Sequence, residues 1–208
     1  MKKLDLIISE SINRVIKEVI ENELTVYHGT PYNFIKFQNK NIGSGEGSQS
    51  FGWGLYFTAN KSVAEYYAKM LKKDVGYVYT VKIRNGHFFE WYKKLDEGFK
   101  RAFVQKMHEM GYDKMPYRRM LVKGKIDTQY LSVEEAVDYF PNGKFFYENV
   151  GLLLGGAKEA SAFLNELGFC GIKYPVGTFM KDKWSDIYGY NYVIFNGDDA
   201  HIIDKKEV

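Results

Sequence analysis

Two repeating patterns of hydrophobic residues run along the chain, and each predicts a different kind of element. Over residues 5–21, apolar side chains recur at the spacing of one helix face, which predicts an amphipathic N-terminal helix. Alternation of apolar and polar residues instead predicts β-strands at 24–27, 52–58 and 77–83. Asn60 follows the second of these strands and is a suitable cap for a helix that continues to about Lys73.

Helical spacing dominates the middle of the chain, between residues 86 and 151. Helices are predicted at about 94–110 and 132–140, and the second begins with Ser132 and Glu135 at the spacing of a capping box. This stretch contains no recognisable chemical motif. We therefore interpret 86–151 as a helical insertion in a β-rich core.

The last quarter of the chain returns to short strands. A helix at 156–167 is followed by Gly168, a residue that commonly ends helices. Alternating patterns then predict strands at 169–174, 190–195 and 200–203. No repeat or linker divides the 208 residues, so we expect one α+β domain over 1–208.

The composition excludes several classes of protein. The net charge of +3, from 29 basic and 26 acidic residues, lacks the strong basic excess of a dedicated nucleic-acid-binding protein. Cys170 is the only cysteine, so an intrachain disulfide is excluded and a reducing compartment is expected. The four histidines are scattered, which predicts no metal site, and no apolar run is long enough to span a bilayer. We expect a cytoplasmic protein.

Candidate chemistry gathers between residues 26 and 68. A short apolar run ends in His28 and Gly29, and a glycine-interrupted aromatic run at 51–58 carries Tyr56. Tyr67 follows eleven residues later, on the helix predicted after Asn60. A lone histidine more often bonds a neighbouring carbonyl, and tyrosines often pack in a core, so both structural roles stay open.

This set of residues resembles the NAD-binding half of the ADP-ribosyltransferase superfamily, on the poly(ADP-ribose) polymerase and diphtheria-toxin side. Within it, the resemblance is closest to the ADP-ribosyltransferase-like domains of phage polyvalent proteins. It implies a split, mixed β core of ADP-ribosyltransferase type that holds NAD in a cleft. It further implies that His28 bonds the adenosine ribose, that the Gly29 backbone reads the nicotinamide carboxamide, and that Thr30 closes the same NAD-binding motif.

The resemblance also assigns the two tyrosines. Tyr56 corresponds to the middle residue of the family's His-Tyr-Glu set, and Tyr67 has the spacing of a second stacking tyrosine. Nicotinamide in NAD is a flat cation, which aromatic faces attract by stacking and cation–π interaction. We therefore expect Tyr56 and Tyr67 to sandwich the nicotinamide ring.

The third catalytic position departs from the family pattern. The family's glutamate usually begins a Glu-Tyr-Val-Val-Tyr-like strand, and the matching strand here begins with Asn191. A carboxylate stabilises the positive charge that develops on the ribose, whereas Asn191 offers a neutral hydrogen bond to the 2′-hydroxyl. Glu46, Glu65 and Asp186 are other possible sources of negative charge, although a solvated surface role is the more common one for each.

The resemblance predicts an NAD-dependent ADP-ribosyltransferase that moves ADP-ribose to a macromolecular acceptor, a protein or a nucleic acid, and releases nicotinamide. His28, Tyr56 and Asn191 are the expected catalytic residues. One alternative is a module that binds NAD or ADP-ribose without turnover, which the neutral Asn191 favours. Another is a structural or partner-binding domain that works through the helix at 5–21 and the insertion. The family likeness alone suggests a bacterial or phage-infected host cell.

Overall fold

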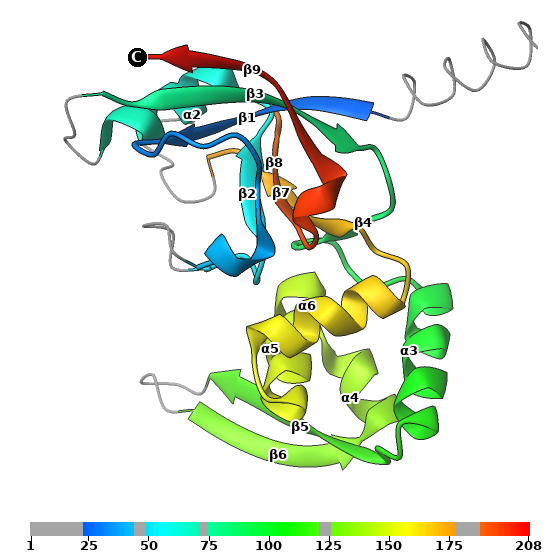
Figure 1. Ribbon diagram of the computed structural model, residues 1–208. Coiled ribbons are helices and arrows are strands. Elements are labelled where there is room, and N and C mark those ends of the chain that lie inside the picture. The colour runs from blue at the N-terminus through cyan, green and yellow to red at the C-terminus, as the bar shows by residue number, and fades with distance from the viewer. Residues whose placement is uncertain (1–22, 44–48, 71–74, 121–125, 178–187) are drawn as a thin grey trace, which may run out of the picture.

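The computed structural model describes residues 23–43, 49–70, 75–120, 126–177 and 188–208 (Figure 1). The predicted helix at 5–21 lies outside the described residues. Two of the candidate acidic residues, Glu46 and Asp186, lie outside them as well.

A seven-stranded sheet forms the β core, with strand order β4-β7-β8-β2-β1-β3-β9. The β4–β7 pair is parallel and the other pairs are antiparallel, so the sheet is mixed. Together with the helices this confirms the predicted α+β class. The strands are β1 Glu23–Thr30, β2 Leu55–Thr58, β3 Tyr77–Arg84, β4 Phe88–Glu90, β7 Gly171–Pro175, β8 Tyr190–Ile194 and β9 Ala200–Glu207.

The sheet is nearly divided between β1 and β2. Their register contains a single pair, Tyr27 with Thr58, whereas β1 and β3 pair along the whole of β1, from Glu23 to Thr30. In Figure 1, β1, β3 and β9 run across the top of the molecule, while β2 and β8 descend from them. The two strands therefore separate beyond Tyr27, and the backbone of residues 28–30 leaves the ladder with β2.

Helix α2, Lys61–Met70, covers β1 on one face of the sheet (Figure 1). Its start is capped as predicted, because the Asn60 side chain accepts a hydrogen bond from the Ser62 amide at 3.0 Å. Its small residues Ala64 and Ala68 are buried against β1 and β3. The helix approaches so closely that a Cβ added to Gly29 would stand 1.7 Å from the Ala64 carbonyl oxygen.

The remaining helices gather at the other end of the molecule with a two-stranded hairpin (Figure 1). Ser132 and Glu135 form the predicted capping box at the start of α4. The sequence analysis expected only helices between 86 and 151, but β4, β5 and β6 also lie there, and β4 joins the main sheet. The elements of this group are α3 Glu97–Glu109, β5 Lys114–Met120, β6 Ile126–Ser132, α4 Val133–Tyr139, α5 Gly143–Leu154 and α6 Ala157–Glu166, and short 3₁₀ turns lie at Asn39–Asn41 and Gly197–Asp199.

Two large apolar clusters make up most of the core. One joins the four helices α3–α6 to the face of the sheet that carries Ile172, Tyr174 and Val193. The other lies on the opposite face, around Val26, Phe57 and Tyr79. Strands β2, β4 and β8 therefore point alternate side chains into the two clusters, as the period of two requires.

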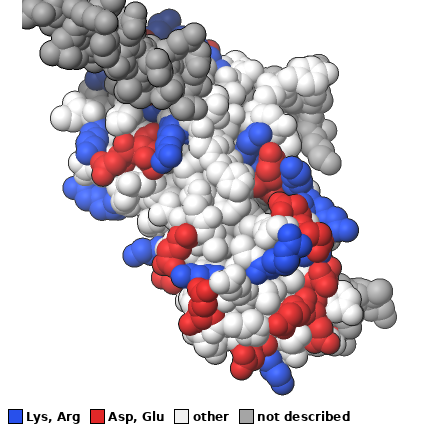
Figure 2. Space-filling view, turned by 90° about the vertical axis from the view of Figure 1, so that its right-hand side faces the viewer, with Lys and Arg blue, Asp and Glu red and all other residues white. Residues whose placement is uncertain are grey.

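The surface shown in Figure 2 mixes the two signs of charge. Lysine and arginine alternate with aspartate and glutamate around an uncharged band. This face carries no continuous basic stripe of the kind that neutralises a nucleic-acid backbone. None of the helices in the described ranges is long and apolar enough to cross a membrane.

Candidate active site

The register of β2, β8 and β7 brings three polar residues into one row across the sheet. Thr58 pairs with Asn191, and Asn191 pairs with Tyr174. The next row on the same face contains Tyr56, Val193 and Ile172. Directly paired residues project to the same side of a sheet, so Tyr56 and Asn191 are diagonal neighbours. The sequence analysis predicted both residues but not that strand pairing places them together.

Tyr56 is half-buried, and its hydroxyl is fully engaged. It accepts a hydrogen bond from the Phe51 amide at 3.1 Å and donates one to the Gly52 carbonyl at 2.8 Å. Burial raises the pKa of Tyr56 far above that of free tyrosine, so the phenol stays neutral. The hydroxyl therefore fixes the turn before β2, and the ring is the part of Tyr56 that remains for a ligand.

Tyr174 lies in the same row of the sheet as Asn191, although the sequence predicted no more for it than a place on the strand at 169–174. Its ring stacks on Phe51, with centroids 3.7 Å apart and planes 6° from parallel. Burial raises the pKa of Tyr174, and the nearby hydroxyls of Tyr56 and Tyr67 raise it further, while a side-chain hydrogen bond from Asn191 lowers it. Of these residues, Asn191 pairs directly with Tyr174 across β7 and β8.

Asn191 leaves one polar atom unpaired in this cluster. Its side-chain oxygen Oδ1 is buried and, among the residues that the structure describes, has no hydrogen-bond partner. An unpaired buried carbonyl costs about 1–3 kcal/mol, and native structures contain few of them. A ligand hydroxyl would satisfy this atom. Oδ1 is therefore an acceptor available to a ligand donor on this face of the sheet.

Two adjacent tyrosines on α2 have different surroundings. Tyr66 packs against the buried residues Val63 and Val176. Tyr67 is 40% exposed, and its ring meets that of Tyr66 edge to face at 5.6 Å. Burial of its inner part raises the pKa of Tyr67. Tyr67 is therefore the more exposed of the two.

His28 lies on the other face of the sheet, among the rings of Phe34, Phe37 and Phe57. Its Nδ1 atom is 2.8 Å from the Tyr56 carbonyl oxygen. A carbonyl only accepts, so Nδ1 carries the proton and Nε2 is left as an acceptor. Burial lowers the pKa of His28, which keeps the imidazole neutral. The side chain bridges the gap where β1 and β2 separate.

Gly29 and Thr30 complete the β1 motif. A side chain has no room at Gly29, because α2 occupies the space beside its Cα, as the Ala64 contact shows. The need for glycine is therefore explained by helix packing. Thr30 is buried, and its hydroxyl accepts a hydrogen bond from the Tyr32 amide at 3.3 Å.

Helices α5 and α6 hold the aromatic turn that leads into β2. The Trp53 amide donates to the Tyr147 hydroxyl at 2.9 Å, and the Ser161 hydroxyl donates to the Trp53 carbonyl at 2.8 Å. Tyr147 and Ser161 also bond each other at 2.8 Å. The helical part of the molecule thus fixes the position of the loop from which Tyr56 extends.

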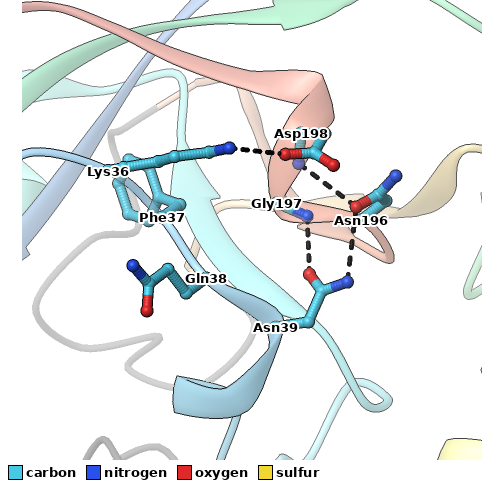
Figure 3. Close-up of a pocket in the computed structure, with 7 residues that line it drawn as sticks. All are labelled: Lys36, Phe37, Gln38, Asn39, Asn196, Gly197 and Asp198. Atoms are coloured by element: carbon cyan, nitrogen blue, oxygen red, sulfur yellow. Dashed lines mark hydrogen bonds and ion pairs between the residues drawn. The ribbon is translucent and has the colours of Figure 1, made fainter.

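A shallow hollow elsewhere on the surface contains none of the predicted site residues. Figure 3 shows that Lys36 and Asp198 face each other across it, 2.8 Å apart, and that Asn39 holds the Gly197 amide at 2.7 Å. These contacts fasten the turn before β9 to the segment that carries Phe37, against which His28 packs edge to face. The hollow is lined by Lys36, Phe37, Gln38, Asn39, Asn196, Gly197 and Asp198.

We refer to Tyr56, Tyr67, Tyr174 and Asn191 as the tyrosine cluster. Of the candidate acidic residues, the structure describes Glu65, and it shows no bond from Glu65 to this cluster. Glu65 lies half-buried on α2, with no ion pair or hydrogen bond to another described residue. Within the described ranges, no group of histidine, cysteine, aspartate and glutamate is arranged to hold a metal ion. Among the described residues, the sheet rows of Tyr56 and Asn191 thus offer the hydroxyls of Tyr56, Thr58 and Tyr174 and one amide.

Comparison with known families agrees with this geometry. The model of the family described as ADP-ribosyltransferase in polyvalent proteins matches residues 22–203. The chain therefore belongs to this family of ADP-ribosyltransferase domains, and the resemblance noted from its motifs is confirmed. The match spans both halves of the sheet and the helical group between them. No curated protein is similar enough to this chain to match it.

Proposed function

We propose that this domain is an NAD-dependent ADP-ribosyltransferase that uses the tyrosine cluster as its nicotinamide site. The observation that carries the proposal is the unpaired, buried Oδ1 of Asn191, on the same sheet face as Tyr56 and Tyr174. Aromatic faces suit the cationic nicotinamide ring, and Oδ1 suits a hydroxyl of the attached ribose. Family membership supports the same reaction class.

In the proposed reaction the bond between the nicotinamide nitrogen and ribose C1′ breaks, and nicotinamide leaves with the bonding electrons. A nucleophile of the acceptor forms a new bond to C1′ and loses its proton. Asn191 would accept a hydrogen bond from the ribose 2′-hydroxyl, which draws electron density toward the developing cation. His28, neutral and with Nε2 as an acceptor, would bond the adenosine ribose, with Gly29 and Thr30 beside it on β1.

The acceptor is proposed to be a macromolecule, either a protein or a nucleic acid. Incubation of the domain with NAD labelled in the adenylate group and a cell lysate, followed by separate protease and nuclease digestion, identifies its class. Free nicotinamide is measured in the same samples. Release of nicotinamide together with labelled macromolecule is the expected result.

A second function, binding of NAD without turnover, is favoured by one specific observation. By the motif resemblance, Asn191 stands where the family usually has glutamate, and an amide stabilises a cation less than a carboxylate does, by roughly 1–3 kcal/mol. Calorimetry with NAD and the nicotinamide assay separate the two functions. Binding with no nicotinamide released by the parent would establish the binding module.

Two variants sharpen this test. If the missing charge limits a slow transferase, Asn191→Glu should raise nicotinamide release. Tyr56→Ala should weaken NAD binding by about fivefold or more through lost stacking, a loss of about 1 kcal/mol. Tyr139→Ala, which truncates a 62% exposed tyrosine on α4, is the matched control and should bind normally. Absence of NAD binding at millimolar concentration would exclude both functions.

A further inference from the structure

Trp53 lies two residues before β2, and side chains from two helices hold its backbone. Its amide donates a hydrogen bond to the Tyr147 hydroxyl on α5 at 2.9 Å. Its carbonyl accepts a hydrogen bond from the Ser161 hydroxyl on α6 at 2.8 Å. The donor and the acceptor of this residue are therefore both bonded by hydroxyls of the helical part of the molecule, at a place where a strand would bond them to another strand.

The two hydroxyls that hold Trp53 are themselves fixed. Tyr147 and Ser161 are buried, and their oxygens lie 2.8 Å apart. The Tyr147 hydroxyl also donates to the carbonyl of Ala157, the first residue of α6, at 2.5 Å. Gly52 packs against the same tyrosine, since an added Cβ would stand 3.1 Å from Tyr147 Cζ. Buried bonds of this kind are costly to leave unmade, so the pair holds the turn in one place.

The same turn determines the direction of the Tyr56 ring. Pairing with β8 fixes the Tyr56 backbone, but the ring can still rotate about its side-chain bonds. Its hydroxyl is bonded to the Phe51 amide at 3.1 Å and to the Gly52 carbonyl at 2.8 Å. Both partners lie one or two residues before Trp53, so a shift of the Trp53 backbone would move the groups that orient the ring.

We propose that Tyr147 and Ser161 are positioning residues of the nicotinamide site: by fixing Trp53, they hold the turn that orients the Tyr56 ring for stacking. The inference rests on the proposed function and deepens it. Both residues act through the turn and not on NAD itself. The helical part of the molecule, which carries no recognisable chemical motif, thereby becomes a component of the NAD site.

The coupling can be measured before any ligand is added, because the Phe51 amide reports on the Tyr56 hydroxyl. In Tyr147→Phe, the Trp53 amide loses its acceptor and should exchange with solvent faster, as measured by NMR hydrogen exchange. If the turn transmits the change, the Phe51 amide should also exchange about fivefold faster or more. Faster exchange of Trp53 alone would show a purely local role and overturn the proposal.

The effect on NAD is measured by calorimetry. Tyr147→Phe should raise the Kd for NAD by about three- to fivefold, because a misdirected Tyr56 ring loses part of its stacking. In the Tyr56→Ala background the same change should leave the Kd nearly unchanged, because no ring is left to orient. Ser161→Ala removes the donor to the Trp53 carbonyl and should act in the same direction. It replaces Tyr147→Phe in both measurements if that variant folds poorly.

Asn149→Leu is the matched control. Asn149 is also a buried residue of α5, and its Oδ1 accepts a hydrogen bond from the Arg118 amide of β5 at 2.7 Å. The substitution leaves a backbone amide without its acceptor, as Tyr147→Phe does, but away from the turn. It should lower the melting temperature to a similar degree and leave both the exchange of the Phe51 amide and the Kd for NAD unchanged.

Different outcomes overturn different conclusions. If Asn149→Leu weakens NAD binding as much as Tyr147→Phe, or if Tyr147→Phe and Tyr56→Ala have additive effects on binding, the positioning role is wrong while the transferase stands. A parent that does not bind NAD at millimolar concentration overturns the proposed function and the role in NAD binding together. The exchange of the Phe51 amide then still decides whether the two hydroxyls orient Tyr56.

Discussion

His28 and Asn191 lie on opposite faces of the sheet beside the β1–β2 split, and they differ in whether their polar side-chain atoms have hydrogen-bond partners. On the His28 face, Nδ1 bonds the Tyr56 carbonyl, and aromatic rings surround the imidazole. On the Asn191 face, Oδ1 is buried without a partner in the described structure. The His28 side chain thus bonds a strand carbonyl at the gap between β1 and β2, whereas Asn191 Oδ1 lacks a hydrogen bond.

This difference separates a side chain that contributes to the fold, His28, from one whose oxygen is left for a ligand, Asn191. Where β1 leaves β2, the Tyr56 carbonyl loses its ladder partner, and the His28 side chain replaces it. His28 thus has a structural role that is present without NAD, in addition to the ligand contact proposed for its Nε2. Asn191 shows no comparable contribution from Oδ1 in the absence of a ligand.

The largest effect is expected from Gly29→Ala, which disturbs both faces at once. The new methyl group would stand 1.7 Å from the Ala64 carbonyl oxygen, and backbone atoms of a packed helix cannot yield cheaply. Displacement of α2 also moves Tyr67 away from Tyr174. We expect a loss of about 3 kcal/mol or more in the free energy of unfolding, measured by urea denaturation.

Gly98→Ala is the matched control for this substitution. Gly98 lies in α3, and its added methyl would meet only the end of the Asp96 side chain, at 3.1 Å. Helix propensity favours alanine there, so stability should be unchanged or slightly higher. Equal stability of Gly29→Ala and the parent would contradict the close packing of α2 on β1.

Without NAD, leucine at position 28 should lower the free energy of unfolding, whereas leucine at position 191 should leave it nearly unchanged. His28→Leu leaves the Tyr56 carbonyl buried and unpaired, so the free energy of unfolding should fall by about 1–3 kcal/mol. Asn191→Leu removes a carbonyl that is already unpaired, so stability should stay within about 1 kcal/mol of the parent. Urea denaturation of both variants measures these changes.

His28→Leu and Asn191→Leu should respond alike when NAD is added. Neither variant should gain the stabilisation that NAD gives the parent, because each lacks a proposed ligand contact. The melting shift at saturating NAD measures this. If ligand-free Asn191→Leu lost as much stability as His28→Leu, Oδ1 would have a structural partner and the contrast between the two faces would disappear.

The smallest expected effect is a pH dependence with opposite signs for two histidines. Burial lowers the pKa of His28, so the unfolded chain binds its proton more readily and stability falls as pH drops below about 6.5. Hydrogen bonds to Glu134 and Asp113 raise the pKa of His108. Its contribution is therefore present below about 6.5 and is lost as pH rises through the raised pKa.

Melting temperatures between about pH 5.5 and 7.5 test both signs. His28→Leu should flatten the acid side of the profile, and His108→Gln should flatten the neutral side. If the melting temperature of His28→Leu fell with decreasing pH as steeply as that of the parent, the fold would not be what keeps His28 neutral.

The sequence by itself determined the local elements and the family. Alternation over 77–83 predicted β3, and the Ser132–Glu135 spacing predicted the start of α4, because both depend on residues a few positions apart. The motif residues at 26–68 were sufficient to indicate the ADP-ribosyltransferase family, which the match over 22–203 confirms. The roles of His28, Tyr56, Tyr67 and Asn191 in binding NAD stay predictions.

Only the tertiary structure decided how these residues meet. Strand register placed Asn191 between Thr58 and Tyr174, and its pairing with Thr58 joins segments more than one hundred residues apart, which no local pattern encodes. The close packing of α2 explains why residue 29 is glycine. The separation of β1 from β2 explains why the His28 side chain bonds the Tyr56 carbonyl. Periodicity fixes which side of a strand a residue faces, whereas its neighbours depend on which strands pair and in what register.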